Sequence, residues 1–113
     1  MAHYKELTVW QKSMEVVVHV YRYTGNFPTS EQYGLTSQMR RAAVSIPSNI
    51  AEGSRRRGKD IRNFLLIAFG SGSELETQLE ASRRLGFGDE QIRIQAESLL
   101  EEVMRMLNKM VNR

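Results

Sequence analysis

The chain has 113 residues, the size of one domain, and its 41% hydrophobic and 26% charged residues are ordinary for a soluble globular protein. It contains no cysteine, which excludes disulfides and thiolate metal sites, and no apolar run that approaches the ~20 residues of a membrane-spanning helix. The first residues lack the basic and apolar segments of a secretory signal, so we expect a cytoplasmic protein that does not bind or span a membrane.

The net charge of +3 is distributed unevenly along the chain. Residues 38–62 contain seven Lys or Arg against two acidic residues, Glu52 and Asp60, which is a local balance of +5. The rest of the chain has nine Lys or Arg against eleven Asp or Glu, which is a balance of −2. Local potential decides where an anionic partner docks, so this segment is the candidate binding surface.

The first predicted helix covers residues 8–24. Apolar side chains recur there at spacings of three and four, which is the pattern of an amphipathic helix. Thr8 and Gln11 have the spacing of a capping box, and Gly25 followed by Asn26 provides a C-terminal stop. The apolar positions are Val9, Trp10, Met14, Val17, Val20 and Tyr21.

The second helix is predicted to begin near Thr29, where Pro28 and Thr29 together with Gln32 again have capping-box spacing. Its apolar stripe is interrupted by Pro47. A proline inside a helix removes one amide donor, and its ring crowds the carbonyl of the residue four positions earlier, here Ala43. The sequence therefore predicts a kinked second helix.

The third helix is predicted over residues 59–85, and the fourth begins after Asp89, a good N-cap residue. Apolar residues cover more than one side of the third helix, and those of the fourth follow a nearly strict heptad pattern. Gly86 is expected to cap the third helix in a left-handed conformation, with Phe87 folded back onto the last turn. Short connections between four such helices predict an all-α fold, an antiparallel up-down-up-down four-helix bundle that forms one domain over residues 1–113.

A polar stripe follows the second helix at helical spacing, and Glu74 of the third helix is expected to join it. It could face a nucleic acid or form a catalytic surface. The favoured interpretation is a hydrogen-bonded network between helices or between subunits, in which Arg41 pairs with Glu52 or Glu74, because an unpaired buried charge is costly. Arg40 points in another direction and is expected to be the more exposed arginine. The predicted network comprises Gln38, Arg41, Ser45, Asn49, Glu52 and Glu74.

A basic cluster follows the polar stripe, at the corner between the second and third helices. Several cations at one corner could contact several phosphates, and each contact would release counterions. The alternative is a solvated turn that keeps the protein soluble, and the sequence does not decide between the two. The residues predicted to contact nucleic acid are Arg40, Arg55, Arg56, Arg57, Lys59 and Arg62.

Other chemistry finds little support in the sequence. Residues 70–73, GSGS, lie in mid-helix and lack the pattern of a phosphate-binding loop. His3 and His19 are far apart, and no carboxylate–histidine cluster has the spacing of a di-iron bundle, so no metal or cofactor is expected. We predict that the protein is not an enzyme; the remaining catalytic alternative is a metal-dependent hydrolase or nuclease at Glu52 and Glu74.

Two groups of apolar residues bear on possible partners. Trp10, Tyr21, Tyr23, Phe27 and Tyr33 could stack on bases, although Trp10 and Tyr21 are expected in the core. The first and third helices also carry more apolar residues than one buried face needs, which predicts self-association. These excess residues are Val16, Val18, Leu66, Ile67 and Phe69.

The chain resembles a known family through three segments: LTVWQKSMEVVVHVY, FPTSEQYGLTSQMRRAAVSIPSNIAEGSRRR and NFLLIAFGSGSELETQLEASRRLGF. They are similar to the four-helix-bundle proteins encoded in intervening sequences of bacterial 23S ribosomal RNA genes. The resemblance covers nearly all of residues 7–87, and RAAVSIPSNIAEG is its most specific part. A related branch comprises the accessory variability proteins of diversity-generating retroelements, basic homopentamers that bind nucleic acid and a reverse transcriptase.

The resemblance implies a four-helix protomer, a homopentamer and a nucleic-acid role, and it transfers no catalytic residue. Gly72 departs from the larger side chain expected at its position, and it would either loosen the third helix or admit a closer neighbour. Charge and resemblance together predict a non-enzymatic, oligomeric protein that binds RNA or DNA through largely sequence-independent phosphate contacts. The alternative is a scaffold for an acidic protein partner, such as a reverse transcriptase or a ribosome-associated factor.

Overall fold

The computed structural model describes residues 3–56 and 59–112, and in these residues every regular element is a helix. The α-helices are α1 (Thr8–Thr24), α2 (Leu35–Ser54), α3 (Lys59–Leu85) and α4 (Glu90–Val111). Two short 3-10 helices, η1 (Tyr4–Glu6) and η2 (Thr29–Glu31), precede α1 and α2. The predicted all-α four-helix fold is confirmed.

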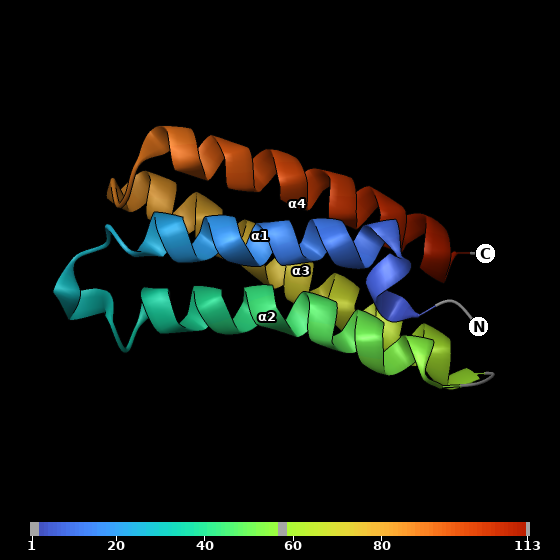
Figure 1. The fold of residues 1–113 in the computed structure, drawn as a ribbon. Helices are drawn as coiled ribbons and strands as arrows, with labels where there is room; N and C mark the ends of the chain where they lie inside the picture. Colours follow the sequence, from blue (N-terminus) through green and yellow to red (C-terminus); the bar gives the residue numbers. More distant parts are fainter. Residues whose placement is uncertain (1–2, 57–58, 113) are drawn as a thin grey trace.

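The four helices lie side by side along one long axis (Figure 1). Each of α1 and α3 packs against both α2 and α4, so the helices follow one another around the bundle in chain order. In Figure 1 the chain travels back and forth between two ends, and the end of α2 meets the start of α3 at one of them. The bundle measures 43 × 24 × 22 Å.

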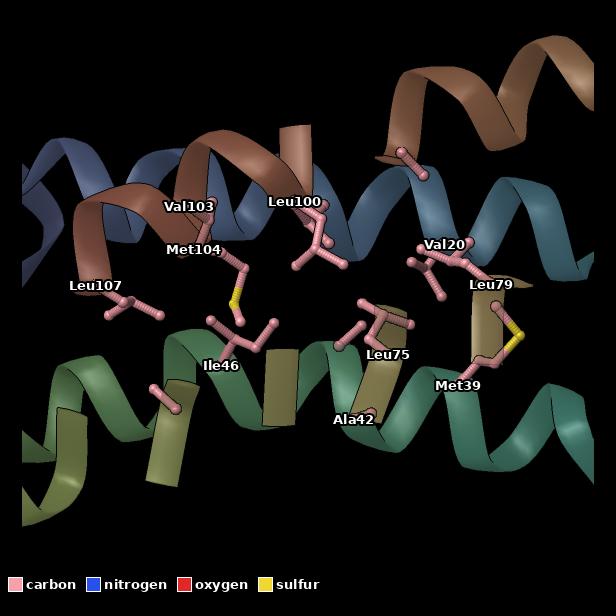
Figure 2. Close-up of a cluster of buried hydrophobic side chains, with 14 of the residues drawn as sticks. Val20, Met39, Ala42, Ile46, Leu75, Leu79, Leu100, Val103, Met104 and Leu107 are labelled. Atoms are coloured by element: carbon pink, nitrogen blue, oxygen red, sulfur yellow. The ribbon is translucent and has the colours of Figure 1, made fainter. Parts of the chain in front are cut away.

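The core is one apolar cluster to which all four helices contribute (Figure 2). Each helix presents side chains at spacings of three and four to the same interior, as an amphipathic helix must. Figure 2 shows α1 and α4 projecting side chains toward those of α2 and α3. Fully buried members include Val20, Met39, Ile46, Leu75, Leu79, Leu100, Val103 and Leu107.

The predicted bounds of α1 are confirmed, but its capping box is wrong. Leu7 is the N-cap residue, and no side chain caps this end of the helix. The side chain of Gln11 reaches past the helix start instead, where Nε2 donates a hydrogen bond to the carbonyl of Lys5 at 3.0 Å.

The predicted start of the second helix is also wrong, because α2 begins at Leu35 rather than near Thr29. The segment after Pro28 forms only the single turn of η2, and Gly34 then leaves helical geometry with φ −111° and ψ −116°. The Glu31 carboxylate caps the new start by accepting a hydrogen bond from the Leu35 amide at 3.1 Å. Pro47 lies inside α2 and is buried, and the kink there stays a prediction.

The predicted bounds and C-terminal cap of α3 and the predicted start of α4 agree with the structure. Gly86 has φ +73°, and the Phe87 amide donates to the Ser82 carbonyl at 3.0 Å, which closes α3 as expected. Asp89 Oδ1 accepts hydrogen bonds from the amides of Gln91 and Ile92 at 2.8 and 3.1 Å, so it caps α4.

The buried aromatic residue of α1 is Tyr23, not Tyr21, and the prediction for Tyr21 is wrong. Tyr23 is fully buried, its hydroxyl is 2.7 Å from Ser82 Oγ, and it donates to the Phe87 carbonyl at 3.0 Å. Tyr21 is 44% exposed, and Trp10 is half-buried against the core. A buried tyrosine needs partners for its hydroxyl, and Ser82 of α3 and Phe87 in the loop after α3 supply them to Tyr23.

Gly72 admits the close neighbour that its small size suggested. A Cβ at this position would overlap the thioether of Met104 on α4. Met104 therefore occupies the space that a larger residue on α3 would fill, and both sites are buried.

Candidate nucleic-acid interface

The corner between α2 and α3 gathers most of the predicted phosphate-binding residues. Arg55 and Arg56 directly follow α2, and Arg62 lies in the first turn of α3. Lys59 is the first residue of α3, and nothing is described of its side chain; Arg57 falls outside the described residues. The corner is therefore formed by a helix end and a helix start that lie together at one end of the bundle (Figure 1).

Each described arginine of the corner rests on a neighbouring group. The Arg55 guanidinium lies 5.3 Å from the centre of the Tyr4 ring, and that of Arg56 lies 5.2 Å from the centre of the Phe64 ring. Arg62 Nε donates to the Val111 carbonyl, at the end of α4, at 2.8 Å. Such contacts restrict the side chains while their remaining N–H groups keep donor capacity.

One corner arginine is partly neutralised. Arg56 Nη2 lies 3.7 Å from Glu52 Oε1, and both side chains are about half exposed. An ion pair this exposed contributes about 0–1 kcal/mol and opens readily when a phosphate competes. Among the described residues, Glu52 thus pairs with an arginine that lies just beyond the end of its own helix.

Arg40 and Arg41 have roles opposite to those predicted. Arg40 is the more buried of the two; its Nε donates to Thr24 Oγ1 at 2.9 Å, and its guanidinium lies 4.5 Å from the centre of the Tyr21 ring. Arg41 is exposed. Both lie about 20 Å from Arg55 along α2, at 1.5 Å per residue, so the predicted basic patch is divided in two.

The predicted polar network is present only around Ser45. The Asn49 side-chain nitrogen donates to the Ser45 carbonyl at 2.8 Å, and the Ser45 hydroxyl lies 2.8 Å from that of Ser71 on α3. The pairing of Arg41 with Glu52 or Glu74 is wrong for the isolated chain, because no ion pair joins them within the described residues. Gln38, Arg41, Glu52 and Glu74 are all exposed and do not form a buried network.

Sequence reasoning missed a hollow beside the two arginines. It has a volume of about 520 Å³ and lies where α1, α2 and the segment before α2 meet. Its lining residues are Tyr21, Gln32, Tyr33, Thr36, Ser37, Arg40, Arg41 and Val44. The late start of α2 creates this site, because it turns residues 32–34 into a loop instead of a helical turn.

A second, apolar hollow of about 330 Å³ continues from the first along the groove between α1 and α2. Val44 lines both hollows. The apolar hollow is lined by Tyr4, Trp10, Met14, Val17, Val44, Pro47, Ser48 and Ala51. The groove therefore has a cationic half and an apolar half.

Metal-ligating and titratable side chains are the remaining candidates for chemistry among the described residues. None of their histidines, aspartates and glutamates form a group of three or more that could hold a metal ion. The clear shift of an acidic pKa is that of Glu80, lowered to about 2 by hydrogen bonds from Arg83 and then Arg84. This carboxylate lies on the surface and pairs within α3, so its shift reflects a local ion pair rather than acid–base chemistry. Of the described helices, none is long and apolar enough to cross a membrane.

The geometry defines a helical bundle with two cationic surfaces. Residues 5–109 match the family described as 23S rRNA-intervening sequence protein, and the chain belongs to this family. The chain is also similar to a solved protein of unknown function from the S23 ribosomal protein family of Bacteroides thetaiotaomicron. That similarity covers 94% of this chain and 100% of the other, with 24% identity and a TM-score of 0.82, and it supports the fold. A comparison with curated proteins found no match.

Proposed function

We propose that this chain is a non-enzymatic, oligomeric nucleic-acid-binding protein of the cytoplasm that contacts phosphates through its basic surface. The observation that carries the proposal is the corner between α2 and α3. There Arg55, Arg56 and Arg62 lie at one end of the bundle, each in contact with a ring or a carbonyl. The excess of basic residues in positions 38–62 adds support.

The contacts of the corner favour phosphate over base readout. A guanidinium donates through several N–H groups, and phosphate oxygens accept them without regard to sequence. None of these arginines lies on a helix face of the kind that enters the major groove as a unit, because they are spread over a helix end, a turn and a helix start. Binding is therefore largely independent of sequence and strongly dependent on salt.

Exposed apolar residues support the oligomeric part of the proposal. Val18 on α1 is 48% exposed, and Leu66 and Ile67 on α3 also remain open to solvent. The prediction for Val16 is wrong, because this side chain is fully buried in the core of its own chain, and Phe69 is half-buried against that core. An oligomer, a pentamer by family resemblance, would multiply the cationic corners and raise the avidity for a polyanion.

The second candidate function is a scaffold for an acidic protein partner. The observation that favours it is the apolar half of the groove between α1 and α2, next to the two arginines. An amphipathic helix with acidic residues at one end would match that combination. Affinity capture from nuclease-treated lysate separates the candidates, since a specific acidic protein that remains bound supports the scaffold.

The main test is fluorescence anisotropy with labelled RNA and DNA over a series of salt concentrations. We expect tight binding at low salt that weakens steeply, and a shallower salt slope when Arg55, Arg56 and Arg57 are replaced by alanine. The matched control replaces Arg83, Arg84 and Arg105, which pair with glutamates on α3 and α4. Equal slopes for wild type and the corner variant would refute the assignment.

A further inference from the structure

Tyr33 is an unusually exposed aromatic residue. It is 89% exposed, more than any other large hydrophobic residue in the described part of the chain. It lies between η2 and α2 and lines the hollow that contains Arg40 and Arg41. A solvent-exposed tyrosine ring contributes neither to the core nor to the capping of these helices. Its face is accessible and can stack on a planar ligand.

The same hollow holds a preoriented arginine. The contacts of Arg40 with Thr24 and the Tyr21 ring use its Nε and one face of the guanidinium. Its terminal nitrogens can still donate hydrogen bonds to an anion. The two contacts have already restricted the conformations of the side chain, so binding costs less entropy. Arg41, the next residue, adds an exposed second cation, and no acidic residue is among those that line the hollow.

An aromatic face next to two guanidinium groups selects an unpaired base with its phosphate. In a duplex the bases are stacked and paired, so their faces are not available to a tyrosine. In a single strand they are available, and stacking on an aromatic ring is tolerant of sequence because every base has a π face. The neighbouring phosphate then lies within reach of an arginine.

One side of α2 connects this hollow to the corner. Arg41, Ser48 and Arg55 follow one another at spacings of seven residues, which places them on nearly the same side of the helix. Ser48 is exposed, as are both arginines. The stripe spans about 21 Å, long enough for several nucleotides, so a strand bound in the hollow can reach the corner along it.

We propose that the hollow lined by Tyr33, Arg40 and Arg41 binds one unpaired base and its adjoining phosphate, and that the protein therefore prefers single-stranded nucleic acid to duplex. This site rests on the proposed nucleic-acid function and adds a second contact region to the corner. The corner arginines supply affinity for either form, and the hollow supplies the discrimination between them.

The test compares Tyr33→Ala with Tyr33→Phe, using a labelled single-stranded RNA without self-complementarity and the duplex made from it. We expect Tyr33→Ala to lower single-strand affinity by about tenfold, with the duplex affinity and both salt slopes unchanged, because stacking and not charge is removed. Tyr33→Phe keeps the ring and should retain wild-type affinity. Arg41→Ala should lower single-strand affinity and reduce the salt slope by about one phosphate contact.

The outcomes separate this site from the proposed function. Equal loss of single-strand and duplex binding in Tyr33→Ala, or no loss in either, overturns the hollow while the corner assignment stands. Absence of binding to both RNAs by the wild-type protein overturns both proposals. Because Tyr33 is almost fully exposed, its variants should unfold at the same urea concentration as the wild type, which checks that folding is unaffected.

Discussion

The two ends of the bundle are built by different means. At the end where α3 turns into α4, Tyr23, Phe27 and Phe87 pack ring against ring, and the Tyr23 hydroxyl is hydrogen-bonded in the interior. At the opposite end, exposed arginines lie on the surface. The Arg55 guanidinium lies over the Tyr4 ring, and Arg62 donates a hydrogen bond to the last turn of α4. The first end buries aromatic rings in the fold, whereas the second leaves charge at the surface, where we propose that a nucleic acid binds.

The largest loss of stability is expected at Tyr23. Truncation of Tyr23 to alanine removes a fully buried ring and leaves a cavity, which costs about 3–5 kcal/mol of unfolding free energy. Tyr23→Phe keeps the ring and removes only the hydroxyl, with an expected cost of about 1–3 kcal/mol because the Phe87 carbonyl loses its donor. Urea unfolding measures both. Similar costs for the two variants would show that the hydroxyl, and not the ring, supports this end.

A paired glycine experiment sharpens the same comparison. Gly86 and Gly88 both have positive φ, 73° and 76°, so alanine is strained by about 1–2 kcal/mol at either site. A Cβ at Gly86 meets nothing within 4 Å, whereas at Gly88 it approaches Tyr23 and Phe27 within 3 Å. Gly88→Ala should therefore lower the unfolding free energy more than Gly86→Ala. Equal unfolding free energies for the two variants would mean that the aromatic cluster can move to accommodate the added Cβ at little cost.

Substitutions at the corner end should affect stability less. Arg62→Ala removes one partly buried hydrogen bond to the Val111 carbonyl, with an expected loss of about 0.5–1.5 kcal/mol. Arg105→Ala is the control, since Arg105 forms only a surface ion pair with Glu101 at 3.5 Å. In thermal unfolding, Arg62→Ala should have a lower melting temperature than Arg105→Ala. A loss at Arg62 as large as that of Tyr23→Ala would contradict the contrast between the ends.

The smallest expected effect concerns pH and Glu80. Its pKa falls from 4.5 to about 2 in the folded protein because Arg83 and Arg84 donate hydrogen bonds to it. The folded-state pKa lies below the unfolded one, so the contribution to stability is complete above about pH 4.5 and is lost as pH falls toward 2. Glu80→Gln should remove this part of the pH dependence. Identical curves of melting temperature against pH for variant and wild type would contradict it.

Local signals were sufficient for most helix boundaries, and their failures have a common cause. Asp89 caps α4 and Gly86 closes α3 as expected, because caps and left-handed glycines act within a few residues. The capping boxes at Thr8 and Thr29 are absent although their spacing was correct. No side chain caps the start of α1, and Glu31 caps α2 at a later start, Leu35, through a contact that the predicted box does not contain.

The corner of the candidate site was predicted by residue type and by position, but the surroundings of Arg40 and Arg41 were not. Basic residues at 55, 56 and 62 were evident from charge, and they do lie at one corner. The exchange between Arg40 and Arg41 was not predictable, because Arg40 is held by Thr24 and Tyr21 of another helix. The hollow at Tyr33 depends on where α2 begins, and so on packing across three segments.

The sequence by itself determined the fold class, the extents of α1 and α3 and the accumulation of charge in residues 38–62, because periodicity, caps and charge are properties of neighbouring residues. Tertiary structure decided which aromatic residue is buried, which arginine is anchored and where the surface is hollowed. Each of these depends on side chains brought together from different helices, such as Tyr23 with Ser82 or Gly72 with Met104. Contacts over such separations follow from the shape of the packed bundle, which no local pattern specifies.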